Sequence, residues 1–332
     1  MPPLSIHEYD QIQNRSIKKD HCFLCGVKLN RLNCSKEHIF SEWLLRRFNL
    51  WNNQLILLNR TSVSYRQAMI SCCKGCNNIL LSNIENLIKK ASNDGFDKFS
   101  KLSEEKIFLW IQKVYYAIFY MEGRFLFDRS DKKGGTIIDD KFIQGYKACH
   151  LFLQAARNKV MFHKPYPWSI FIFKLQKYNI EKLNFDYRDH PSMAVAIRIG
   201  EVGIIACLQD NNTQKQYFGD IFERIKKISL HPIQFNELIA KVFYRESLRN
   251  RTPKYIMYEG KKYLEVNSLP LVGLSSKPIY DDWINAEYAK FLSFHCHIDY
   301  DKAYEKSSDK VWTILYNENS NLRELDITSC GF

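Results

Sequence analysis

Apolar side chains recur at helical spacing in two stretches of the first half of the chain, residues 78–90 and 103–123. In the second stretch Ser103 is a favourable N-cap, and apolar or aromatic side chains then occupy nearly every face as far as Gly123. A helix that is apolar on all sides packs inside a core, which we favour over a base-stacking role for its aromatic side chains. We predict a further helix over residues 139–158.

Strand patterns dominate the second half of the chain. Apolar runs predict strands at 168–175, 193–199 and 202–208. Gly200 suits the first central position of a type II′ turn, so the last two strands are expected to pair antiparallel. The other predicted elements are two short strands and two helices, at 255–258, 263–266, 235–243 and 281–294. Because helices and antiparallel strands are mixed, the predicted fold class is α+β.

Length and composition exclude several classes of protein. The chain has 332 residues, 45% of them apolar and 25% charged, as in average globular proteins. At about 150 residues per domain, this length predicts two domains. The sequence contains neither an apolar run of about 18 residues nor the apolar leader of a secreted protein. We therefore expect a cytoplasmic protein with no membrane partner.

Basic side chains are concentrated near the start of the chain. The net charge is +12, from 48 Lys and Arg against 36 Asp and Glu. Residues 1–80 contain 11 basic and 5 acidic side chains, so a quarter of the chain carries half of the net charge. Positive charge of this kind suits a polyanion, because neutralised phosphates release their counterions. A basic protein without a nucleic-acid partner is the alternative that composition leaves open.

Four of the ten cysteines form two CxxC pairs, Cys22 with Cys25 and Cys73 with Cys76. Ten cysteines in a cytoplasmic chain argue against a disulfide framework. A CxxC pair turns two thiolates toward one ion, and each pair has a glycine beside its second cysteine, so we predict one structural Zn²⁺ site. The 47 residues between the pairs exceed the roughly 15–20 of a simple zinc ribbon, which indicates an insertion. Cys34 and Cys72 are alternative ligands that complete no CxxC pair.

The insertion and the residue after the second pair carry candidate catalytic groups. Glu37 and His38 are adjacent inside the insertion, and Asn77 directly follows Cys76. A carboxylate and an amide oxygen are hard ligands that suit Mg²⁺ or Mn²⁺, and a neutral imidazole beside such an ion deprotonates a water. Taken singly, Glu37 and His38 fit an exposed pair before a helix, and Asn77 fits a helix N-cap. Their position between and after two CxxC pairs favours the catalytic interpretation.

This order of residues, CxxC, then Glu-His-Ile, then CxxC-Asn, resembles the His-Asn-His (HNH) endonucleases of the treble-clef, ββα-metal class. The layout is similar to that of phage junction-resolving and bacterial HNH nucleases with four cysteines, over about residues 20–90. The resemblance implies that the four CxxC cysteines bind structural Zn²⁺. It also implies that Glu37 and Asn77 hold a catalytic Mg²⁺ or Mn²⁺, and that His38 is the general base.

Three features depart from the family pattern. Ser41 stands where related sequences often have proline, and Glu37 is one methylene longer than the aspartate common in the class. The middle asparagine, which braces a loop in the family, has three candidates, and Asn59 is favoured over Asn52 and Asn53 because it ends an apolar run. Candidate phosphate contacts are Arg31, Lys36, Arg46, Arg47, Arg60, Arg66 and Lys74.

We therefore expect a metal-dependent endonuclease that hydrolyses phosphodiester bonds in DNA, with RNA left open as a substrate. The expected organisation is an N-terminal extension (1–20), a treble-clef nuclease domain with zinc (21–90) and a larger α+β domain with antiparallel sheet (91–332). The resemblance associates such chains with restriction or anti-phage defence, and with a homodimer or a regulatory protein partner. The alternative is a zinc-containing module that binds nucleic acid or a partner protein without cleaving.

Overall fold

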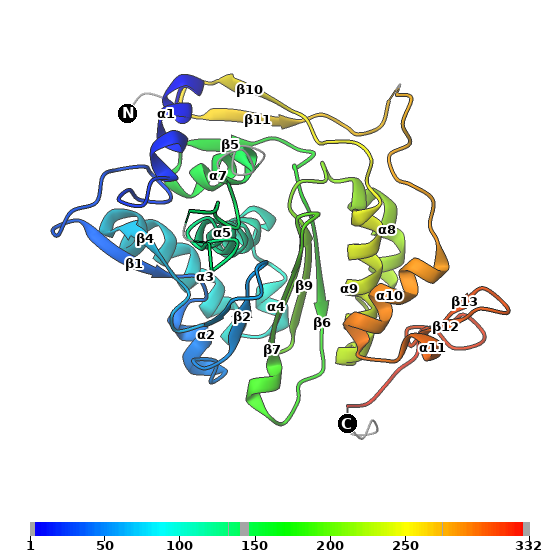
Figure 1. Ribbon diagram of the computed structural model, residues 1–332. Coiled ribbons are helices and arrows are strands. Elements are labelled where there is room, and N and C mark those ends of the chain that lie inside the picture. Colours follow the sequence, from blue (N-terminus) through cyan, green and yellow to red (C-terminus); the bar gives the residue numbers. More distant parts are fainter. Residues whose placement is uncertain (1–3, 132, 140–145, 274, 328–332) are drawn as a thin grey trace. The chain divides into compact units, whose positions relative to one another are not determined.

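The chain folds into two units, each built from helices and mostly antiparallel strands (Figure 1). The computed structural model describes residues 4–131, 133–139, 146–273 and 275–327. Unit 1 takes its residues from three stretches, 1–93, 102–163 and 256–267. Unit 2 takes the remaining stretches, 94–101, 164–255 and 268–332. The predicted α+β fold class is confirmed.

The boundary predicted at residue 90 does not coincide with this division. Helix α5 (Glu104–Glu122) belongs to unit 1, where it packs on elements formed by the first 93 residues. Its Lys113 side chain donates a hydrogen bond to the backbone carbonyl of His38, 75 residues earlier in the chain. Packing between such distant segments leaves no local mark in the sequence, so periodicity alone could not show it.

The centre of unit 1 is an antiparallel pair of strands, β1 (Cys34–His38) and β4 (Met69–Cys73). Cys34 lies opposite Cys73 and His38 opposite Met69, so the insertion leaves the pair just beyond His38. The insertion contains one short helix and a hairpin, namely α2 (Glu42–Arg47), β2 (Gln54–Ile56) and β3 (Ser62–Ser64). Directly after β4 the chain becomes helical, first as the π-helical turn η1 (Cys76–Leu81) and then as α3 (Ser82–Asn93).

Helix α5 is the central helix of unit 1, as its pattern predicts. Ser103 caps it by accepting a hydrogen bond from the Lys106 amide at 3.4 Å, and every side chain from Ile107 to Glu122 is buried. The core interpretation of its aromatic side chains is therefore confirmed. The other elements of unit 1 are α1 (Ile6–Ser16), α7 (Lys147–Leu153), η2 (Gln154–Arg157) and the sheet β10-β11-β5, formed by Tyr255–Glu259, Leu264–Ser268 and Val160–Phe162.

Unit 2 is built on an antiparallel sheet with the strand order β6-β9-β8-β7. These strands are β6 (Ser169–Lys174), β7 (Phe185–His190), β8 (Ala194–Ile199) and β9 (Val202–Cys207). Gly200 adopts a φ of +62° in the turn between β8 and β9, which is the left-handed conformation expected at that position. The predicted hairpin is thereby confirmed, in the register Ile199 opposite Val202.

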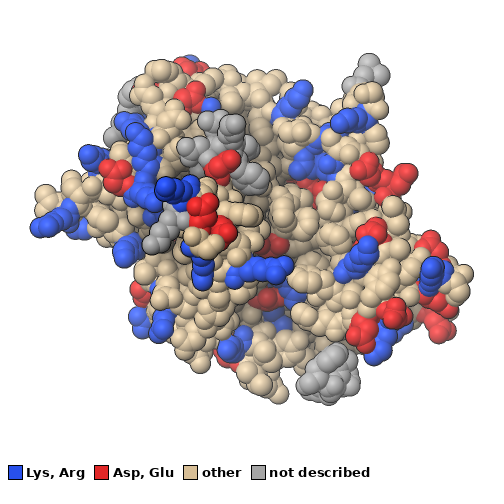
Figure 2. All heavy atoms as spheres, in the orientation of Figure 1, with Lys and Arg blue, Asp and Glu red and all other residues tan. Residues whose placement is uncertain are grey.

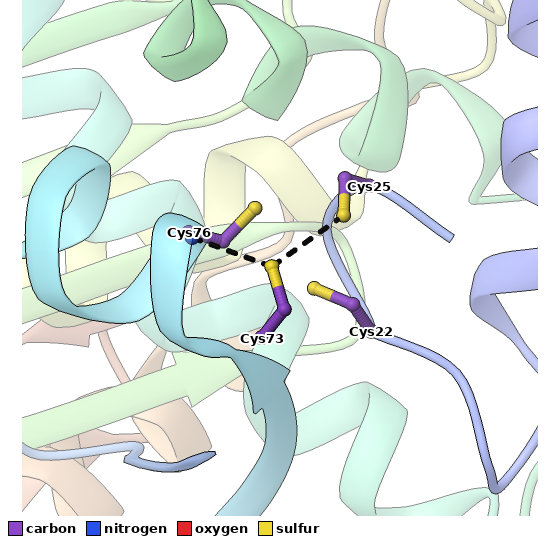
Figure 3. A group of neighbouring side chains, drawn as sticks. All are labelled: Cys22, Cys25, Cys73 and Cys76. Atoms are coloured by element: carbon purple, nitrogen blue, oxygen red, sulfur yellow. Dashed lines mark hydrogen bonds between the residues drawn. The ribbon is translucent and has the colours of Figure 1, made fainter. Parts of the chain in front are cut away.

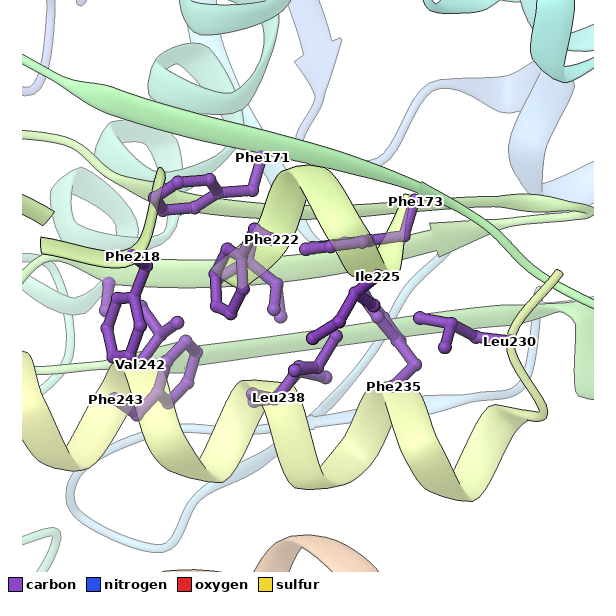
Figure 4. Packing of buried hydrophobic residues seen from close by; sticks show 14 of the residues in the cluster. Phe171, Phe173, Phe218, Phe222, Ile225, Leu230, Phe235, Leu238, Val242 and Phe243 are labelled. Carbon is purple, nitrogen blue, oxygen red and sulfur yellow. The ribbon is translucent and has the colours of Figure 1, made fainter. Parts of the chain in front are cut away.

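Two amphipathic helices, α8 (Thr213–Ile225) and α9 (Pro232–Ser247), bury their apolar faces in the core of unit 2 (Figure 4). Phe222 of α8 packs edge-on against Phe171 of the sheet, with ring centroids 4.7 Å apart. The remaining elements of unit 2 are α4 (Phe96–Phe99), η3 (Glu181–Asn184), α10 (Asn285–Cys296), α11 (Tyr300–Ala303), β12 (Tyr304–Glu305) and β13 (Lys310–Val311). Within the described residues, no helix combines the length and the apolar character that crossing a bilayer requires.

Two predicted helices differ from those in the structure. The helix predicted over 139–158 is α7 followed by η2, so it begins at Lys147, and residues 140–145 lie outside the described residues. The helix predicted over 281–294 begins at Asn285, because residues 281–284 form no helical turn and Ile284, the N-cap, is extended. Helix boundaries depend on capping contacts, which a hydrophobic pattern does not contain.

Asp210 and Glu246 are neighbouring carboxyl groups buried in unit 2. Asp210 accepts hydrogen bonds from Ser169 Oγ and from the amides of Asn212 and Gln214. Glu246 accepts from Arg249 Nε at 2.7 Å and from Gln214 Nε2 at 2.8 Å. The Cys207 thiol lies close to both carboxyl groups. All four carboxylate oxygens have hydrogen-bond donors, so the group is a hydrogen-bonded network rather than an open metal site.

We predict that this network makes the stability of the protein fall as the pH rises from about 4.5 to about 7. Burial raises the pKa of Asp210 to about 6 and that of Glu246 from 4.5 to about 7. Between about pH 4.5 and pH 7 the folded state therefore holds protons that the unfolded state has already released. Unfolding releases these protons, so the free energy of unfolding falls as the pH rises. In Glu246→Gln, the free energy of unfolding, measured in urea at several pH values, should depend less on pH in this window. The control is Glu287→Gln, an exposed carboxyl on α10, and equal slopes in all three proteins would contradict the prediction.

Candidate functional site

The two CxxC pairs come together in unit 1. The Sγ atoms of all four cysteines lie within 4.8 Å of one another, although the pairs are far apart in the sequence (Figure 3). Cys25 Sγ is 3.7 Å from Cys73 Sγ. A disulfide would need about 2.05 Å, whereas the sulfurs of a tetrahedral zinc site with bonds of about 2.3 Å lie about 3.8 Å apart. The four cysteines could therefore hold one metal ion.

The first pair is held in place by a tight turn and by α7. Gly26 follows Cys25 with a φ of +65°, and a Cβ atom there would lie 2.6 Å from the Ile12 carbonyl oxygen. The Leu24 carbonyl between the two cysteines accepts hydrogen bonds from Gln154 Nε2 at 3.0 Å and lies 3.1 Å from His150 Nε2. The glycine predicted beside the first pair is thus required by the backbone.

The glycine of the second pair has no such role. Gly75 has a φ of −63°, and a Cβ atom there would meet nothing within 4 Å. The reason is that Cys76 begins a helix, and a helical start needs no left-handed residue.

The clustering of the thiols also affects their ionisation. Hydrogen bonds from neighbouring thiols, first among them Cys25, lower the pKa of Cys22.

The two alternative ligands differ in their surroundings. Cys72 is buried, and its sulfur lies 3.8 Å from Cys22 Sγ, but it belongs to none of the described groups of three or more metal-binding side chains. Cys34 is exposed and its thiol is directed to the Ser35 carbonyl. The four cysteines of the two CxxC pairs remain the set that fits one ion.

A pocket of about 670 Å³ opens beside the β1–β4 pair, and it is lined by Glu37, His38 and Asn77. Helices α2 and α3 supply most of the rest of its wall, namely Ser41, Glu42, Trp43, Arg46, Arg47, Glu85, Asn86 and Lys89, together with Lys36 from β1. The three residues that sequence analysis proposes as catalytic therefore face one space.

Glu37 is buried, so the alternative interpretation of Glu37 and His38 as an exposed pair before a helix does not hold for Glu37. Its side chain is only 6% exposed, and Oε1 lies 2.5 Å from the ammonium of Lys113. The same ammonium is 2.8 Å from Oε1 of Glu85. Burial raises the pKa of Glu37 to about 6, and Lys113 opposes this shift. For Lys113 itself, burial disfavours the charge, but Glu37 and Glu85 together outweigh burial and raise its pKa.

His38 is half-buried with its two ring nitrogens in different surroundings. Nδ1 is buried and has no hydrogen-bond partner, whereas Nε2 lies 3.7 Å from the exposed carboxylate of Glu42. The ring stands edge-on to Trp51, with centroids 6.3 Å apart. Burial lowers the pKa of His38 although Glu42 acts against it, which favours the neutral form of the imidazole.

Asn77 points its amide group back toward β1. Nδ2 donates to the Lys36 carbonyl at 3.0 Å and to Ser35 Oγ at 2.9 Å. Because a carbonyl can only accept, the amide nitrogen must face β1, and the amide oxygen takes no part in these two bonds. Asn77 is not the N-cap of the following helix, a position that Gly75 occupies.

Comparison of the chain with models of protein families, with curated proteins and with solved structures finds no match. The candidate site therefore has to be judged on its own geometry. That geometry brings together the four CxxC cysteines and, in one pocket, Glu37, His38 and Asn77.

The predicted phosphate contacts are only partly gathered at this pocket. Arg46 is exposed on its rim, pairs with Glu42 at 3.2 Å and stacks over Trp51. Arg47 also lines the pocket, but it donates to Asn93 Oδ1 at 2.8 Å. Four others, Arg31, Arg60, Arg66 and Lys74, are exposed outside the pocket lining. On the face drawn in Figure 2, basic side chains lie beside acidic ones.

Asn59 lies in the turn between β2 and β3, away from the pocket lining. Its Oδ1 accepts a hydrogen bond from the Thr61 amide at 2.9 Å, and its Nδ2 donates to the Leu126 carbonyl at 2.8 Å. Asn59 thus ties its own loop to a later segment of unit 1. These contacts connect loops, as a bracing asparagine does, but they are made at the β2–β3 turn rather than at Glu37, His38 or Asn77.

Sequence reasoning missed Lys113 and Glu85. Lys113 is the one charged side chain between Ile107 and Met121 of α5, and that isolated charge was the one available signal that a buried partner must exist. Glu85 carried no signal, because an acidic residue on an amphipathic helix is ordinarily solvated.

We predict that Gly26→Ala destabilises unit 1, whereas Gly75→Ala does not. The left-handed φ and the close Ile12 carbonyl oblige the backbone to shift in Gly26→Ala, at a cost on the order of 1–3 kcal/mol. Gly75→Ala replaces a helical glycine in open space and should be neutral or stabilising by up to about 1 kcal/mol. Urea denaturation of both variants measures the difference, and equal effects would contradict the assignment of the tight turn to the first pair.

Proposed function

We propose that the protein is a metal-dependent endonuclease of the HNH type that hydrolyses phosphodiester bonds in DNA. The observation that carries this proposal is that Glu37, His38 and Asn77 line one pocket. They are brought there by the β1–β4 pair and the helix that follows it, which also carry the second CxxC pair. A structural metal, a carboxylate, an imidazole and an amide in this arrangement are the parts that the resemblance to HNH nucleases requires.

We assign Zn²⁺ to the four cysteines and a treble-clef fold to the segment around them. Thiolate sulfurs suit Zn²⁺, and four of them close the coordination shell, so the ion would be structural. The support is the order of elements: a turn with the first pair, the two antiparallel strands, and a helix that begins at the second pair. Bound zinc would tie the turn to the helix and so fix the orientation of β1.

The pocket offers oxygen ligands to a second cation. Glu37 has one carboxylate oxygen against Lys113 and a second oxygen besides, and the amide oxygen of Asn77 takes no part in the bonds that Nδ2 makes to β1. Carboxylate and amide oxygens suit Mg²⁺ or Mn²⁺ rather than zinc. A divalent cation bound there would stabilise negative charge on the leaving 3′ oxygen of the phosphodiester.

His38 is the general base of the proposed reaction. Its Nδ1 is shut off from solvent, so Nε2 is the nitrogen that can take a proton from the attacking water. Glu42, 3.7 Å from Nε2, would favour the protonated ring that results. Water attack at phosphorus breaks the bond to the 3′ oxygen and leaves a 5′-phosphate and a 3′-hydroxyl.

Basic side chains around the pocket suit a phosphate backbone. Lys36, Arg46 and Lys89 are exposed and come from β1, α2 and α3, so they stand on different walls of the pocket. Contacts of this kind recognise phosphates without reading base sequence, and we therefore expect little sequence specificity.

A module that binds nucleic acid without cleaving it is the second candidate function. The observation that favours it is that the Lys113 ammonium already takes one oxygen of Glu37, the residue proposed to hold the catalytic cation. Such a module would keep its affinity for DNA in a chelator, whereas the proposed nuclease needs the cation for cleavage.

We predict that the protein with Mg²⁺ or Mn²⁺ nicks plasmid DNA, and that His38→Ala lowers the rate by about 10²–10⁴-fold, the usual loss when a general base is removed. The matched control is His7→Ala, an exposed histidine on α1, which should cleave like the wild type. EDTA should abolish cleavage. Binding of DNA without cleavage in every protein would favour the binding module instead.

We also predict that the purified protein carries one zinc ion, which Cys73→Ser loses. Removing one of four thiolates weakens the tetrahedral site and destabilises unit 1, because zinc binding contributes to folding. Metal analysis and thermal melting measure both effects. Cys34→Ser, which alters an exposed cysteine on the neighbouring strand, should keep its zinc, and equal zinc content in both variants would contradict the assignment.

A further inference from the structure

Two carboxylates share one ammonium at the buried side of the pocket. Lys113 Nζ lies 2.5 Å from Glu37 Oε1 and 2.8 Å from Glu85 Oε1. It also donates to the backbone carbonyls of His38 at 2.7 Å and Ile39 at 3.2 Å. Four oxygen atoms therefore surround the Lys113 nitrogen. When both carboxylates are ionised, they carry two negative charges against the one positive charge of Lys113. One negative charge is then left that no described side chain within the cluster neutralises.

The pocket beside this cluster contains a buried hydroxyl group that has no hydrogen-bond partner. Glu37 and Glu85 both line it, and each carboxylate has a second oxygen besides the one at Lys113. Ser41 lines the same pocket and is only 3% exposed, yet its hydroxyl has no hydrogen-bond partner. Buried polar atoms in folded proteins are usually satisfied, so an unpaired hydroxyl in a pocket that two carboxylates also line suits a cation with its water shell.

We propose that Glu85 is a further ligand of the divalent cation, beside Glu37 and Asn77, and that Lys113 is a positioning residue that presents both carboxylates. The inference rests on the proposed function, because it concerns the same cation. Two carboxylates at one point repel each other, and an ammonium between them allows both to stay there. Its bonds to the His38 and Ile39 carbonyls also fix the end of β1, from which Glu37 and His38 project.

Binding of Mn²⁺ to the zinc-loaded full chain, measured by calorimetry without nucleic acid, tests the assignment of Glu85. We expect Glu85→Gln and Glu37→Gln each to weaken Mn²⁺ binding by about tenfold or more. The control is Glu8→Gln, because Glu8 is an exposed carboxyl on α1 that does not line the pocket. It should change the affinity by less than about threefold, as expected for an exposed charge.

The outcomes separate this inference from the proposed function. Wild-type affinity in Glu85→Gln together with weak binding in Glu37→Gln would overturn the role of Glu85 and leave the nuclease proposal standing. Absence of Mn²⁺ binding in the wild type would overturn both. If Glu85→Gln does not fold, Glu85→Asp keeps the charge for Lys113 and shortens the side chain by one methylene. Its Mn²⁺ affinity should still fall, and an unchanged affinity would overturn the inference.

A second experiment tests the role of Lys113. Lys113→Met leaves two carboxylates without their ammonium, so the protein should melt at a lower temperature in EDTA than the wild type. Mn²⁺ should then raise the melting temperature of Lys113→Met by more than it raises that of the wild type, because the cation replaces the missing charge. Lys89→Met, at an exposed lysine of the same pocket, should respond like the wild type. A melting temperature of Lys113→Met that does not depend on Mn²⁺ would overturn the proposal.

Discussion

The buried ammonium of Lys113 is the interaction on which the candidate site depends. It lies inside unit 1 between the carboxylates of Glu37 and Glu85, and it also binds the carbonyls at the end of β1. Removing one partner of a buried ion pair costs about 3–5 kcal/mol, because the remaining charge stays buried without compensation. A side chain from α5 thus stabilises α3 and β1 in one arrangement, and these two elements, together with α2, supply most of the pocket lining.

The other end of β1 is fixed by different chemistry. Cys34 lies opposite Cys73 in the strand pair, and Cys73 is one of the four clustered cysteines. The cluster joins β4, the start of η1 and the turn around Gly26, which α7 and η2 support through the Leu24 carbonyl. Strand β1 is therefore held at its first residue through the cysteine cluster and at its last through Lys113. Glu37 and His38 consequently have little freedom to move relative to Asn77.

Unit 2 also contains buried carboxyl groups, but their surroundings differ from those in unit 1. Its sheet and its helices α8 and α9 bury a continuous aromatic and aliphatic core. Asp210 and Glu246 are buried beside this core with every carboxylate oxygen hydrogen-bonded. In unit 1 Glu37 and Glu85 share one ammonium and line a pocket. This contrast separates a structural network from a candidate binding site, because a network whose oxygens all have donors leaves no acceptor for a ligand.

The sequence by itself determined the α+β class, the central helix from Ser103, the hairpin at Gly200 and the four cysteines that cluster, since these depend on local periodicity, turn residues and spacing. It also singled out Glu37, His38 and Asn77, which the fold brings to one pocket. Only the tertiary structure decided that α5 belongs with the first 93 residues, that Glu37 is buried, and that Lys113 and Glu85 complete the cluster. The reason is physical: burial and ion pairing depend on which distant segments pack together, and no local pattern records that choice.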